Sequence, residues 1–424
     1  MTHHNTIIIG GGASGLMTAA VLSGSRHGMS TSNGSISILE KNSDVGTKLS
    51  LSGGGRCNIT NDIPDPKQFL EHFPQSKQYL YTAFDQYSRL DTEEFFTTNG
   101  LPLVTQARNR MFPITEKAAD VTKTLLKICN KNSVDIRTNT VAKSIFHADS
   151  VWHIKTNKGT FACEHLVLST GGYAAPETGS TGDGFAFLKQ LGHAVTKPSP
   201  NLVPLRTDAS WVHELSGASI NYCKLRFYAD TNGVMKQKIN KTGRILFTHF
   251  GISGPLVLNS SHEVSELLSW HSTVECSLDL FPDNDHGQLD TKLLKLLNAS
   301  PKKQLINLLP ELLPKQLVQA ILGQSKIEVR LPSGQVSKLQ RKAIVNISKD
   351  LRFPITGTMG FERAVIADGG VSLNEVDFKT MMSRKHQNLY IVGDLLDINR
   401  PSGGFSLQLC WTTGFVAARH ISKQ

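Results

Sequence analysis

Residues 6 to 15 read TIIIGGGASG, an apolar run that ends in a glycine-rich turn. The turn fits the pattern G-x-G-x-x-G, and residues 16 to 22 (LMTAAVL) continue it as a helix pattern rich in small side chains. A second β-prone run, SISIL at residues 35 to 39, ends at Glu40. Strand, glycine turn, helix, strand and acid in this order predict a Rossmann-type dinucleotide-binding unit.

Each part of this unit has a separate expected task. Gly10 allows the tight turn, Gly12 lets the backbone approach a pyrophosphate, and Gly15 lets the helix pack close to the strand. The N-terminus of the helix offers free N–H groups to the phosphates. Glu40 is the expected acceptor for ribose hydroxyls, and it lies 25 residues past Gly15 because the polar stretch 23 to 35 enlarges the loop. The alternative, a glycine-rich turn that binds nothing, leaves the agreement of all five features unexplained.

The C-terminal region decides which dinucleotide is expected, since one fingerprint also suits a nicotinamide dehydrogenase. Residues 389 to 394 (LYIVGD) predict a strand that ends in Gly393-Asp394, followed by a glycine turn and a helix pattern from about 404 to 421. In FAD enzymes of the glutathione-reductase type, such an aspartate binds the ribityl chain, which NAD lacks, and the next helix points its N-terminus at the flavin. A turn-capping aspartate is the alternative for Asp394 alone. Together with the N-terminal fingerprint, it predicts FAD.

Periodicity and composition divide the chain into three expected parts. Residues 1–195 and 346–424 are predicted to form a discontinuous α/β FAD-binding domain of the Rossmann type. Residues 196–287 and 324–345 carry short alternating runs that predict an inserted β-barrel-like substrate domain. Residues 288–323 have leucines at helical spacing, interrupted by prolines, and predict a small helical subdomain.

Two further expectations concern the inserted part. The leucine-rich segment forms the core of a helical subdomain, or else presents a lid or partner-binding surface. Residues 326 to 350 are expected to return to strands. We expect the insertion to cover the flavin ring, with the substrate cavity at its junction with the nucleotide domain, because ligand sites commonly lie between domains.

The composition bounds the class of protein. Of 424 residues, 39% are hydrophobic and 19% are charged, which is typical of a globular protein. No run approaches the roughly 18 apolar residues of a membrane span, and the first residues lack a signal-peptide pattern, so we expect a cytoplasmic protein without a membrane partner. None of the six cysteines forms a C-x-x-C pair, which argues against a metal site and a redox dithiol.

The net charge of +10 allows two interpretations. It attracts RNA or phosphate-rich ligands, or it is a solvated basic surface. The basic residues are scattered, with no run of five or six. We therefore expect a small-molecule substrate and no nucleic-acid partner, and the sequence leaves the oligomeric state open.

Several segments together resemble one family, the BaiN-like, aminoacetone-oxidase-family FAD-binding flavoproteins, which are NAD(P)/FAD-dependent oxidoreductases. The matching strings are GTK at 46–48, SGGGRCN at 52–58, STGG at 169–172, GSTGDG at 179–184, LFTHFGISGP at 246–255, GGV at 369–371 and GDLLD at 393–397. The resemblance implies a two-dinucleotide-binding-type FAD fold with an inserted barrel and a helical subdomain. The stretch NRPS at 399–402 and the residues around Gln408 depart from the family pattern, so a member's substrate does not carry over.

The motifs and the resemblance together predict a set of FAD-binding residues. Val141 is included because the residue after the strand 135–140 presents its backbone to the adenine in this fold; a plain strand valine is the alternative. The set is Gly10, Gly12, Ala13, Ser14, Gly15, Glu40, Lys41, Lys48, Ser52, Gly53, Gly54, Arg56, Asn58, Val141, Thr170, Gly171, Gly172, Gly393, Asp394, Gly404 and Phe405.

Four residues are candidates for chemistry beyond binding. Arg56, or Lys48 in its place, would stabilise the negative charge of reduced flavin; a structural ion pair is the alternative for Arg56. Cys57 would be a nucleophile or a small buried thiol. His249 would be a proton donor in the substrate cavity or a hydrogen-bonded turn histidine.

Two functions of different class remain open. The first is an FAD-dependent oxidoreductase that takes electrons from NAD(P)H as a transient reductant and reduces a small unsaturated or carbonyl substrate, or that oxidises a small amine. The second is a flavoprotein that acts on or binds RNA. The diffuse distribution of charge favours the first.

Overall fold

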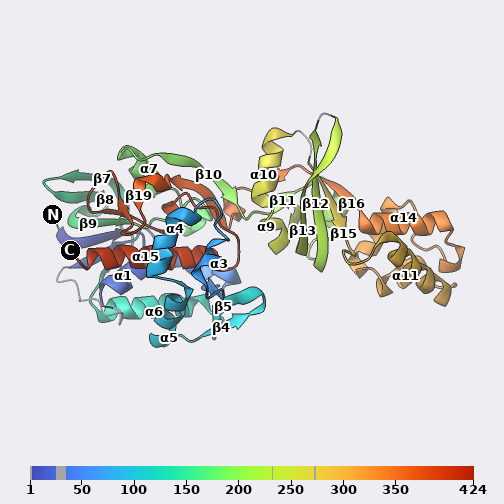
Figure 1. Ribbon diagram of the computed structural model, residues 1–424, viewed down its shortest axis with the longest axis horizontal. Coiled ribbons are helices and arrows are strands. Elements are labelled where there is room, and N and C mark those ends of the chain that lie inside the picture. The colour runs from blue at the N-terminus through green and yellow to red at the C-terminus, as the bar shows by residue number, and fades with distance from the viewer. Residues whose placement is uncertain (1, 25–34, 232, 272–273) are drawn as a thin grey trace. The chain divides into compact units, whose positions relative to one another are not determined.

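The computed structural model describes residues 2–24, 35–231, 233–271 and 274–424 (Figure 1). Within this part the chain divides into two compact units. The first unit comprises Met1–Pro200 and Val365–Gln424, and the inserted unit comprises Asn201–Ala364. The enlarged loop expected at residues 23 to 35 falls largely outside the described residues.

A nine-stranded sheet forms the centre of the first unit. Its strands are β1 (Thr2–Ile9), β2 (Ile36–Leu39), β6 (Asp135–Arg137), β7 (Ala142–Ala148), β8 (Val151–Thr156), β9 (Gly159–Leu168), β19 (Val376–Asp377), β20 (Met382–Ser383) and β21 (Leu389–Ile391). Their order is β19-β20-β21-β9-β1-β2-β6, and β8 joins β7 to β9. β1 pairs in parallel with β2 and β9, and β21 pairs in parallel with β9. Ile7, Ile8 and Ile38 are fully buried, as expected of a parallel sheet covered on both faces.

Helices cover this sheet. The C-terminal helix α15 (Phe405–Ile421) and α6 (Ala118–Lys131) both pack against α1 (Ala13–Leu22), as Figure 1 shows. The remaining helices are α2 (Thr47–Leu51), α3 (Pro66–Leu70), α4 (Lys77–Gln86), α5 (Arg89–Thr98) and α7 (Asp183–Gln190). Two small sheets complete the unit: β3 (Thr60–Asn61) with β5 (Arg110–Pro113) and β4 (Leu103–Gln106), and β10 (Val195–Asn201) with β18 (Ile366–Val371).

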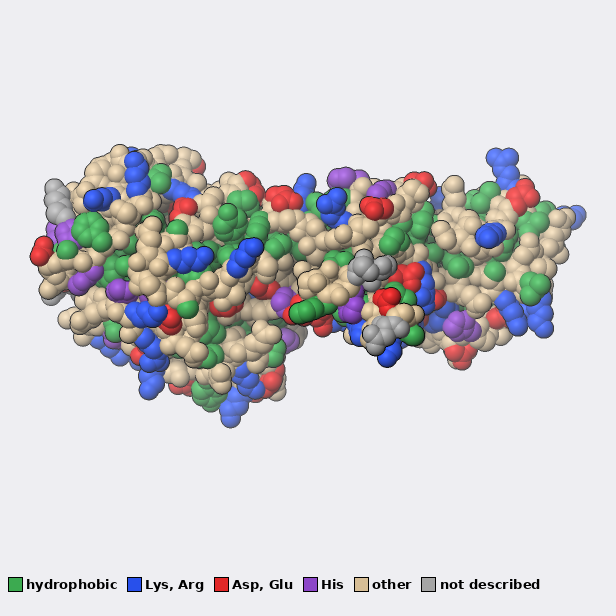
Figure 2. All heavy atoms as spheres, turned by 90° about the horizontal axis from the view of Figure 1, so that it is seen from above, with side chains coloured by type: hydrophobic (Ala, Val, Ile, Leu, Met, Phe, Trp, Pro, Cys, Tyr) green, Lys and Arg blue, Asp and Glu red, His purple; other side chains and the backbone are tan. Residues whose placement is uncertain are grey.

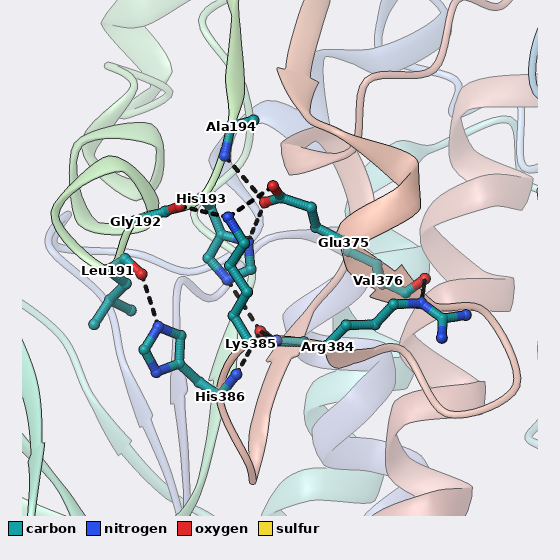
Figure 3. Close-up of polar contacts among 10 residues, drawn as sticks. Leu191, Gly192, His193, Ala194, Glu375, Val376, Arg384, Lys385 and His386 are labelled. Atoms are coloured by element: carbon teal, nitrogen blue, oxygen red, sulfur yellow. Dashed lines mark hydrogen bonds and ion pairs between the residues drawn. The ribbon is translucent and has the colours of Figure 1, made fainter.

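A partly buried polar network connects the chain after α7 with the segment around β19 and β20 (Figure 3). His193 Nδ1 lies 2.8 Å from Glu375 Oε2, and His193 Nε2 lies 3.0 Å from Ser383 Oγ. Glu375 also accepts the Ala194 N–H at 3.0 Å and pairs with Lys385 at 2.8 Å. Ser383 is buried and its hydroxyl accepts backbone N–H groups. The network therefore has a structural role, in which it holds these two segments together.

The inserted unit is built on a seven-stranded antiparallel sheet. Its strands are β11 (Leu205–Arg206), β12 (Ser219–Thr231), β13 (Val234–Thr248), β14 (Gly251–Ser253), β15 (Val274–Asp279), β16 (Leu351–Ile355) and β17 (Gly357–Thr358). Their order is β16-β15-β12-β13-β14-β11-β17, with β16 and β17 unpaired with each other in the described part. The expected β-barrel-like domain is therefore a sheet that does not close into a barrel within the described residues. The sheet nevertheless curves back on itself, because its two edge strands are separated in sequence only by Thr356.

Short helices accompany this sheet, and a helical group lies in sequence between β15 and β16. The helices are α8 (Ser210–Glu214), α9 (Pro255–Leu258), α10 (Ser261–Trp270), α11 (His286–Ala299), α12 (Leu305–Leu308), α13 (Val318–Gln324) and α14 (Lys338–Lys349). Most of the leucines expected at helical spacing are buried, among them Leu293, Leu305 and Leu317, whereas Leu294 is exposed. They form core of the inserted unit, which agrees with the first of the two interpretations.

The expectation of strands over residues 326 to 350, including 324–345 in the barrel, is wrong. This stretch contains α14, which packs against α11 and α13. Ser337 and Gln340 form a capping box, in which each side chain bonds the other residue's backbone N–H. The buried Ile344, Val345 and Ser348 follow at spacings of one and three. The cap and the helical spacing outweigh the β-branched composition of the segment.

The boundary of the first unit also differs from the expected residue 346. Because β16 and β17 pair within the inserted sheet, the chain returns to the first unit only at Val365. Among the residues that the structure describes, no helix is both long and apolar enough to cross a membrane.

Candidate functional site

The glycine turn between β1 and α1 is as close-packed as its sequence pattern requires. Gly10 has φ +104°, and a Cβ placed on it would lie 2.5 Å from the Ser169 carbonyl oxygen. A Cβ on Gly15 would overlap the Gly10 carbonyl oxygen and lie 2.6 Å from Ser169 Oγ. At Gly12, by contrast, nothing lies within 4 Å of the Cβ position. Gly10 and Gly15 therefore serve the packing of the turn, whereas Gly12 borders open space.

The N-terminus of α1 faces that space with its backbone N–H groups unused by side chains. Gly12 precedes the helix without a side-chain cap, and the first turn contains no acidic residue. Glu40 Oε2 accepts the Gly11 N–H at 2.7 Å, and Oε1 accepts the Asn42 N–H at 2.8 Å. Each carboxylate oxygen keeps a second acceptor position, so Glu40 is held in place and can still accept hydroxyl groups.

A pocket in the first unit brings many of the predicted residues together. The predicted residues that line it are Gly10, Gly12, Ala13, Ser14, Glu40, Lys41, Lys48, Ser52, Val141, Thr170, Gly171 and Asp394. The predicted residues that do not line it are Gly15, Gly53, Gly54, Arg56, Asn58, Gly172, Gly393, Gly404 and Phe405. The pocket thus runs from the β2 side of the sheet to the N-terminal end of α15.

Sequence reasoning missed other lining residues. They include Gly11, Asn42, Gly46, Thr47, Leu49, Thr140, Ser169, Asp183, Phe187, Ser406, Leu407 and Cys410. The last three lie in the first two turns of α15, so helical periodicity counted from Gly404 could have found them. Asn42 follows no motif that points to this pocket, whereas Asp183 lies in the string GSTGDG at 179–184.

Val141 is placed at the pocket, but its backbone is already engaged. Its N–H donates to Asn157 Oδ1 at 2.8 Å, and its C=O accepts the Asn157 N–H at 3.1 Å. Both backbone groups of Val141 thus have protein partners, and its presentation of the backbone to an adenine stays a prediction. Its side chain is 36% exposed at the pocket and offers an apolar surface to a base.

Lys41 is an anchor between two segments. Its Nζ lies 2.7 Å from Asp183 Oδ2 and also contacts Thr181 Oγ1. Lys41 follows Glu40, and Asp183 begins α7. The ion pair closes one wall of the pocket, and the lysine charge is balanced there.

Asp394 lies at the centre of a compact charged group. It pairs with Arg400 through Oδ1 and with Lys48 through Oδ2, the latter at 3.3 Å. Arg400 is 1% exposed and also donates to the Ile398 carbonyl. Burial alone would raise the pKa of Asp394, but Arg400 and Lys48 outweigh burial and hold the pKa below its usual range. Two cations and one carboxylate leave a net positive charge beside the pocket.

Two predicted glycines, Gly172 and Gly393, lie next to Asp394 and help to fix its position. A Cβ on Gly172 would lie 3.2 Å from the Asp394 carbonyl oxygen. The Gly393 N–H donates to Thr413 Oγ1 of α15 at 3.0 Å, and a Cβ on Gly393 would lie 2.5 Å from Ser14 Oγ. These residues position Asp394 and do not line the pocket themselves.

The loop of residues 52 to 58 contains three successive glycines and, after them, two residues with buried side-chain atoms. Gly53, Gly54 and Gly55 all have positive φ. Cys57 is fully buried, and burial raises the pKa of its thiol to about 12, which favours the small buried thiol over the nucleophile. Asn58 Oδ1 is buried and finds no hydrogen-bond partner within the described ranges.

The start of α15 packs tightly against β3. A Cβ on Gly404 would lie 2.5 Å from the Thr60 carbonyl oxygen. Phe405 points into an aromatic cluster, with its ring centre 4.9 Å from Phe69 and 4.4 Å from His72. Its side chain is therefore part of the core, and only the backbone of this turn is available at the helix N-terminus.

The two residues predicted for catalysis lie in different units. Arg56, in the first unit, has Nη1 3.7 Å from Glu116 Oε2 and its guanidinium 4.7 Å from the centre of the Phe112 ring. His249, in the inserted unit, is exposed and its ring packs edge-on against Phe250. Its role stays a prediction.

Comparison with protein-family models matches residues 4–420 to the family described as HI0933-like protein Rossmann domain. The chain belongs to the HI0933-like family. The resemblance to the BaiN-like, aminoacetone-oxidase-family flavoproteins is thereby confirmed, and so is the Rossmann-type FAD-binding class of the fold.

Curated relatives of this HI0933-like protein match over almost their full lengths. A 3-dehydro-bile acid delta(4,6)-reductase of Clostridium scindens is 28% identical, with 98% of each chain covered. A ribosomal RNA dihydrouridine synthase of Haemophilus influenzae is also 28% identical, with 100% of this chain and 99% of the relative covered. A protein of the same description from Escherichia coli is 28% identical over 99% of this chain and 98% of its own.

Solved structures share the fold at low identity. A 3-ketosteroid delta1-dehydrogenase from Sterolibacterium denitrificans has a TM-score of 0.55 and 12% identity, with 100% of both chains covered. A 3-ketosteroid-delta4-(5alpha)-dehydrogenase from Rhodococcus jostii has a TM-score of 0.52 and 13% identity, covering 100% of this chain and 97% of the other. Family and relatives together make this HI0933-like protein a flavin-dependent oxidoreductase with FAD as its cofactor.

The residues of the first unit fit FAD in three respects. The open space at Gly12 beside the α1 N-terminus suits a pyrophosphate. Glu40 keeps acceptor positions for ribose hydroxyls. Asn58 carries a buried amide oxygen without a partner in the described part of the chain, as expected where a donor is to bind.

Proposed function

We propose that this protein reduces a carbon–carbon double bond conjugated with a carbonyl group in a small molecule, with NAD(P)H as the electron donor. The net reaction consumes one NAD(P)H and one proton and yields the saturated carbonyl compound and NAD(P)⁺. The observation that carries the proposal is the family membership together with the named activities of relatives matched over almost their full lengths. A delta(4,6)-reductase and a dihydrouridine synthase both add two hydrogens across a carbon–carbon double bond.

The chain's own residues would serve binding and electrostatics. FAD, when bound, would supply the chemistry of two-electron transfer between the donor and the substrate. Lys48 and Arg400 bring two positive charges to Asp394 at the pocket, and α15 directs its N-terminus toward the same end. Both features would stabilise negative charge that develops there. We propose that the pocket-lining residues predicted above hold the cofactor.

Protein thiols are poor candidates for relaying electrons. All six cysteines are free and buried. Burial raises the pKa of Cys57 and Cys410 to about 12, so these thiols stay protonated and unreactive at neutral pH. This supports direct reduction of the cofactor by a nicotinamide over a dithiol relay.

An anaerobic titration of the purified yellow protein tests the proposal. NADH and NADPH are added separately, and loss of the flavin's visible absorbance is followed. We expect one of the two to bleach the flavin, and a conjugated enone to restore the colour while gaining two hydrogens by mass spectrometry. Chemical reduction by dithionite is the positive control. Bleaching by dithionite but by neither nicotinamide would contradict the donor, and failure of every enone to reoxidise the flavin would contradict the substrate class.

Uridine in RNA is the second candidate substrate. It is favoured by the net charge of +10 and by full-length relatives described as ribosomal RNA dihydrouridine synthases. The hairpin strand β13 exposes Lys236, Lys238 and Arg244. Against it, basic side chains on the face seen in Figure 2 are scattered among acidic ones. A filter-binding assay with labelled RNA at two salt concentrations separates the candidates, because phosphate contacts give a steep salt dependence.

A further inference from the structure

Three arginines lie together beside the loop of residues 52 to 58. Arg108 and Arg110 belong to the hairpin of β4 and β5, and Arg56 belongs to the loop. The Arg56 guanidinium lies 4.7 Å from the centre of the Phe112 ring, and the Arg110 guanidinium lies 5.7 Å from the same centre. Two cations therefore share one buried ring, which fixes their side chains. We call Arg56, Arg108 and Arg110 the arginine cluster.

Negative charge near the cluster is too small to balance it. Glu116 pairs with Arg56, and Asp62, which follows β3, is engaged by an arginine outside the cluster. Neither Arg108 nor Arg110 has an ion pair within the described residues. Burial lowers the pKa of Arg110, and the charges of Arg56 and Arg108 lower it further. The three guanidinium groups thus repel one another, and a bound anion would relieve that repulsion.

The backbone holds Arg108 out at the tip of the hairpin. Arg108 and Asn109 have φ +64° and +54°, so two successive non-glycine residues adopt the left-handed conformation. The Asn61 side-chain amide donates to the Arg108 carbonyl at 3.3 Å, and the Asp62 N–H donates to the Asn109 carbonyl. The tip is fixed, and the Arg108 side chain is left exposed. Such backbone strain is retained where neighbouring contacts enforce it.

The cluster and the cofactor pocket flank the same loop. A Cβ on Gly53 would lie 3.5 Å from Phe112 Cε1. Ser52, the neighbouring residue, lines the pocket. An anion bound by the cluster would therefore be separated from the residues proposed to hold the flavin only by the loop of residues 52 to 58.

We propose that the arginine cluster binds an oxyanion of the substrate and so orients the substrate at the pocket. The proposal rests on the proposed function, because it assigns the charge class of the same enzyme's substrate. Guanidinium groups present paired N–H donors that match the two oxygens of a phosphate or carboxylate. Two sources offer this chemistry: the phosphodiester of a uridine-containing RNA, and the carboxylate of a small conjugated enone.

Equilibrium binding to the oxidised holoprotein, without an electron donor, tests the cluster apart from turnover. In each of two matched pairs of probes, one member carries negative charge and the other is its uncharged analogue. The first pair is a fluorescent oligouridylate and its uncharged methylphosphonate analogue. The second is a 3-oxo-Δ4 steroid carboxylic acid and its methyl ester. Binding is measured by fluorescence anisotropy for the first pair and by titration calorimetry for the second.

The variants are Arg108→Asn and Arg110→Gln. Asparagine tolerates the left-handed backbone at position 108, so Arg108→Asn keeps the turn. Arg384→Gln is the control, because it removes one positive charge from an arginine outside the cluster whose side chain is 58% exposed. FAD content and thermal unfolding are measured for each variant. Arg108→Asn provides the decisive result if Arg110→Gln does not fold.

We expect the charged member of one pair to bind at least about ten-fold tighter than its neutral analogue, as for one charge-assisted hydrogen bond. The preference should disappear in Arg108→Asn and persist in Arg384→Gln. The pair that shows it identifies the source of the oxyanion. No charge preference in either pair, or a preference that survives in Arg108→Asn, overturns the proposal. Turnover with NAD(P)H and a neutral enone would remain informative about the proposed function in either case.

Discussion

Arg400, with only 1% of its surface exposed, forms an ion pair with Asp394, whose other carboxylate oxygen lies 3.3 Å from Lys48. One partly buried carboxylate thus pairs with two cations at the edge of the pocket. The stretch NRPS at 399–402, where the sequence departs from its family, supplies the more deeply buried of the two.

Arg400→Met should lower the free energy of unfolding by about 3 kcal/mol, because removal of one member of a buried pair leaves the other poorly compensated. Lys48→Met is the matched control. Its side chain is 29% exposed, so its loss should be smaller. Urea unfolding of both apoproteins measures the difference. Equal losses in the two variants would show that burial does not set the strength of the pair.

Gly12→Val and Gly15→Ala should fail in different ways. The Gly12 site has open space and φ −82°, so Gly12→Val should fold but lose FAD, because its side chain enters the space proposed for the pyrophosphate. Gly15→Ala should lower the free energy of unfolding by about 2 kcal/mol or more, because its Cβ overlaps the Gly10 carbonyl. Flavin-to-protein absorbance and thermal unfolding separate the two effects. A Gly12→Val protein that is still yellow would show that the pyrophosphate does not bind at Gly12.

Cys57→Ser should retain FAD and fold normally. The thiol is fully buried, and burial raises its pKa to about 12. In the native wild type it should therefore resist iodoacetamide at neutral pH, while the denatured chain reacts. Peptide mass spectrometry after alkylation checks this. A rapidly alkylated native Cys57 would restore the nucleophile hypothesis.

Stability of the first unit should fall as the pH drops below 6.5. Burial lowers the pKa of His193, which outweighs the opposite effect of Glu375, whose charge is shared with Lys385. The folded state therefore favours neutral His193, and stability present above pH 6.5 is lost as the unfolded chain takes up the proton. His193→Gln should reduce the slope of unfolding free energy against pH by up to about 1.4 kcal/mol per pH unit. An unchanged slope would assign the acid sensitivity to other groups.

His249→Ala should slow substrate-dependent turnover and leave the FAD content unchanged. The motivation is the turn of residues 248 to 254, in which Gly251 and Gly254 have positive φ and the exposed His249 ring makes no hydrogen bond among the described residues. His286→Ala, at an exposed helix start in the same unit, is the control. Steady-state rates at matched flavin concentration decide the matter. Unchanged turnover would remove His249 from the mechanism.

Residue roles could be predicted from the sequence where a motif permits only a few backbone arrangements. Gly10, Gly15 and Glu40 could be assigned because a glycine turn between a strand and a helix permits few arrangements. The segment of α14 was missed because its composition is β-branched, and its capping box at Ser337 and Gln340 was the signal that could have corrected the prediction.

Contacts between side chains and residues elsewhere in the fold could not be predicted from the sequence. Arg400 meets Asp394 within a short loop, yet nothing in the local pattern shows that its guanidinium turns inward. Asn157 engages the backbone of Val141 from 16 positions away, and tertiary pairing of this kind has no periodic signature. The barrel was predicted from alternating runs, which report strands but not whether the two edges of a sheet meet.

The sheets of both units are completed by segments from late in the chain. This order affects folding during synthesis. β21 joins β9, and α15 covers α1, so residues 389 to 421 complete a sheet that begins at Thr2. The inserted sheet likewise gains its two edge strands only at residues 351 to 358. Contacts between such distant segments slow folding, and during synthesis the exposed face of α1 must wait for the last helix to emerge. Apolar surface that stays exposed during synthesis makes an incomplete chain prone to aggregation.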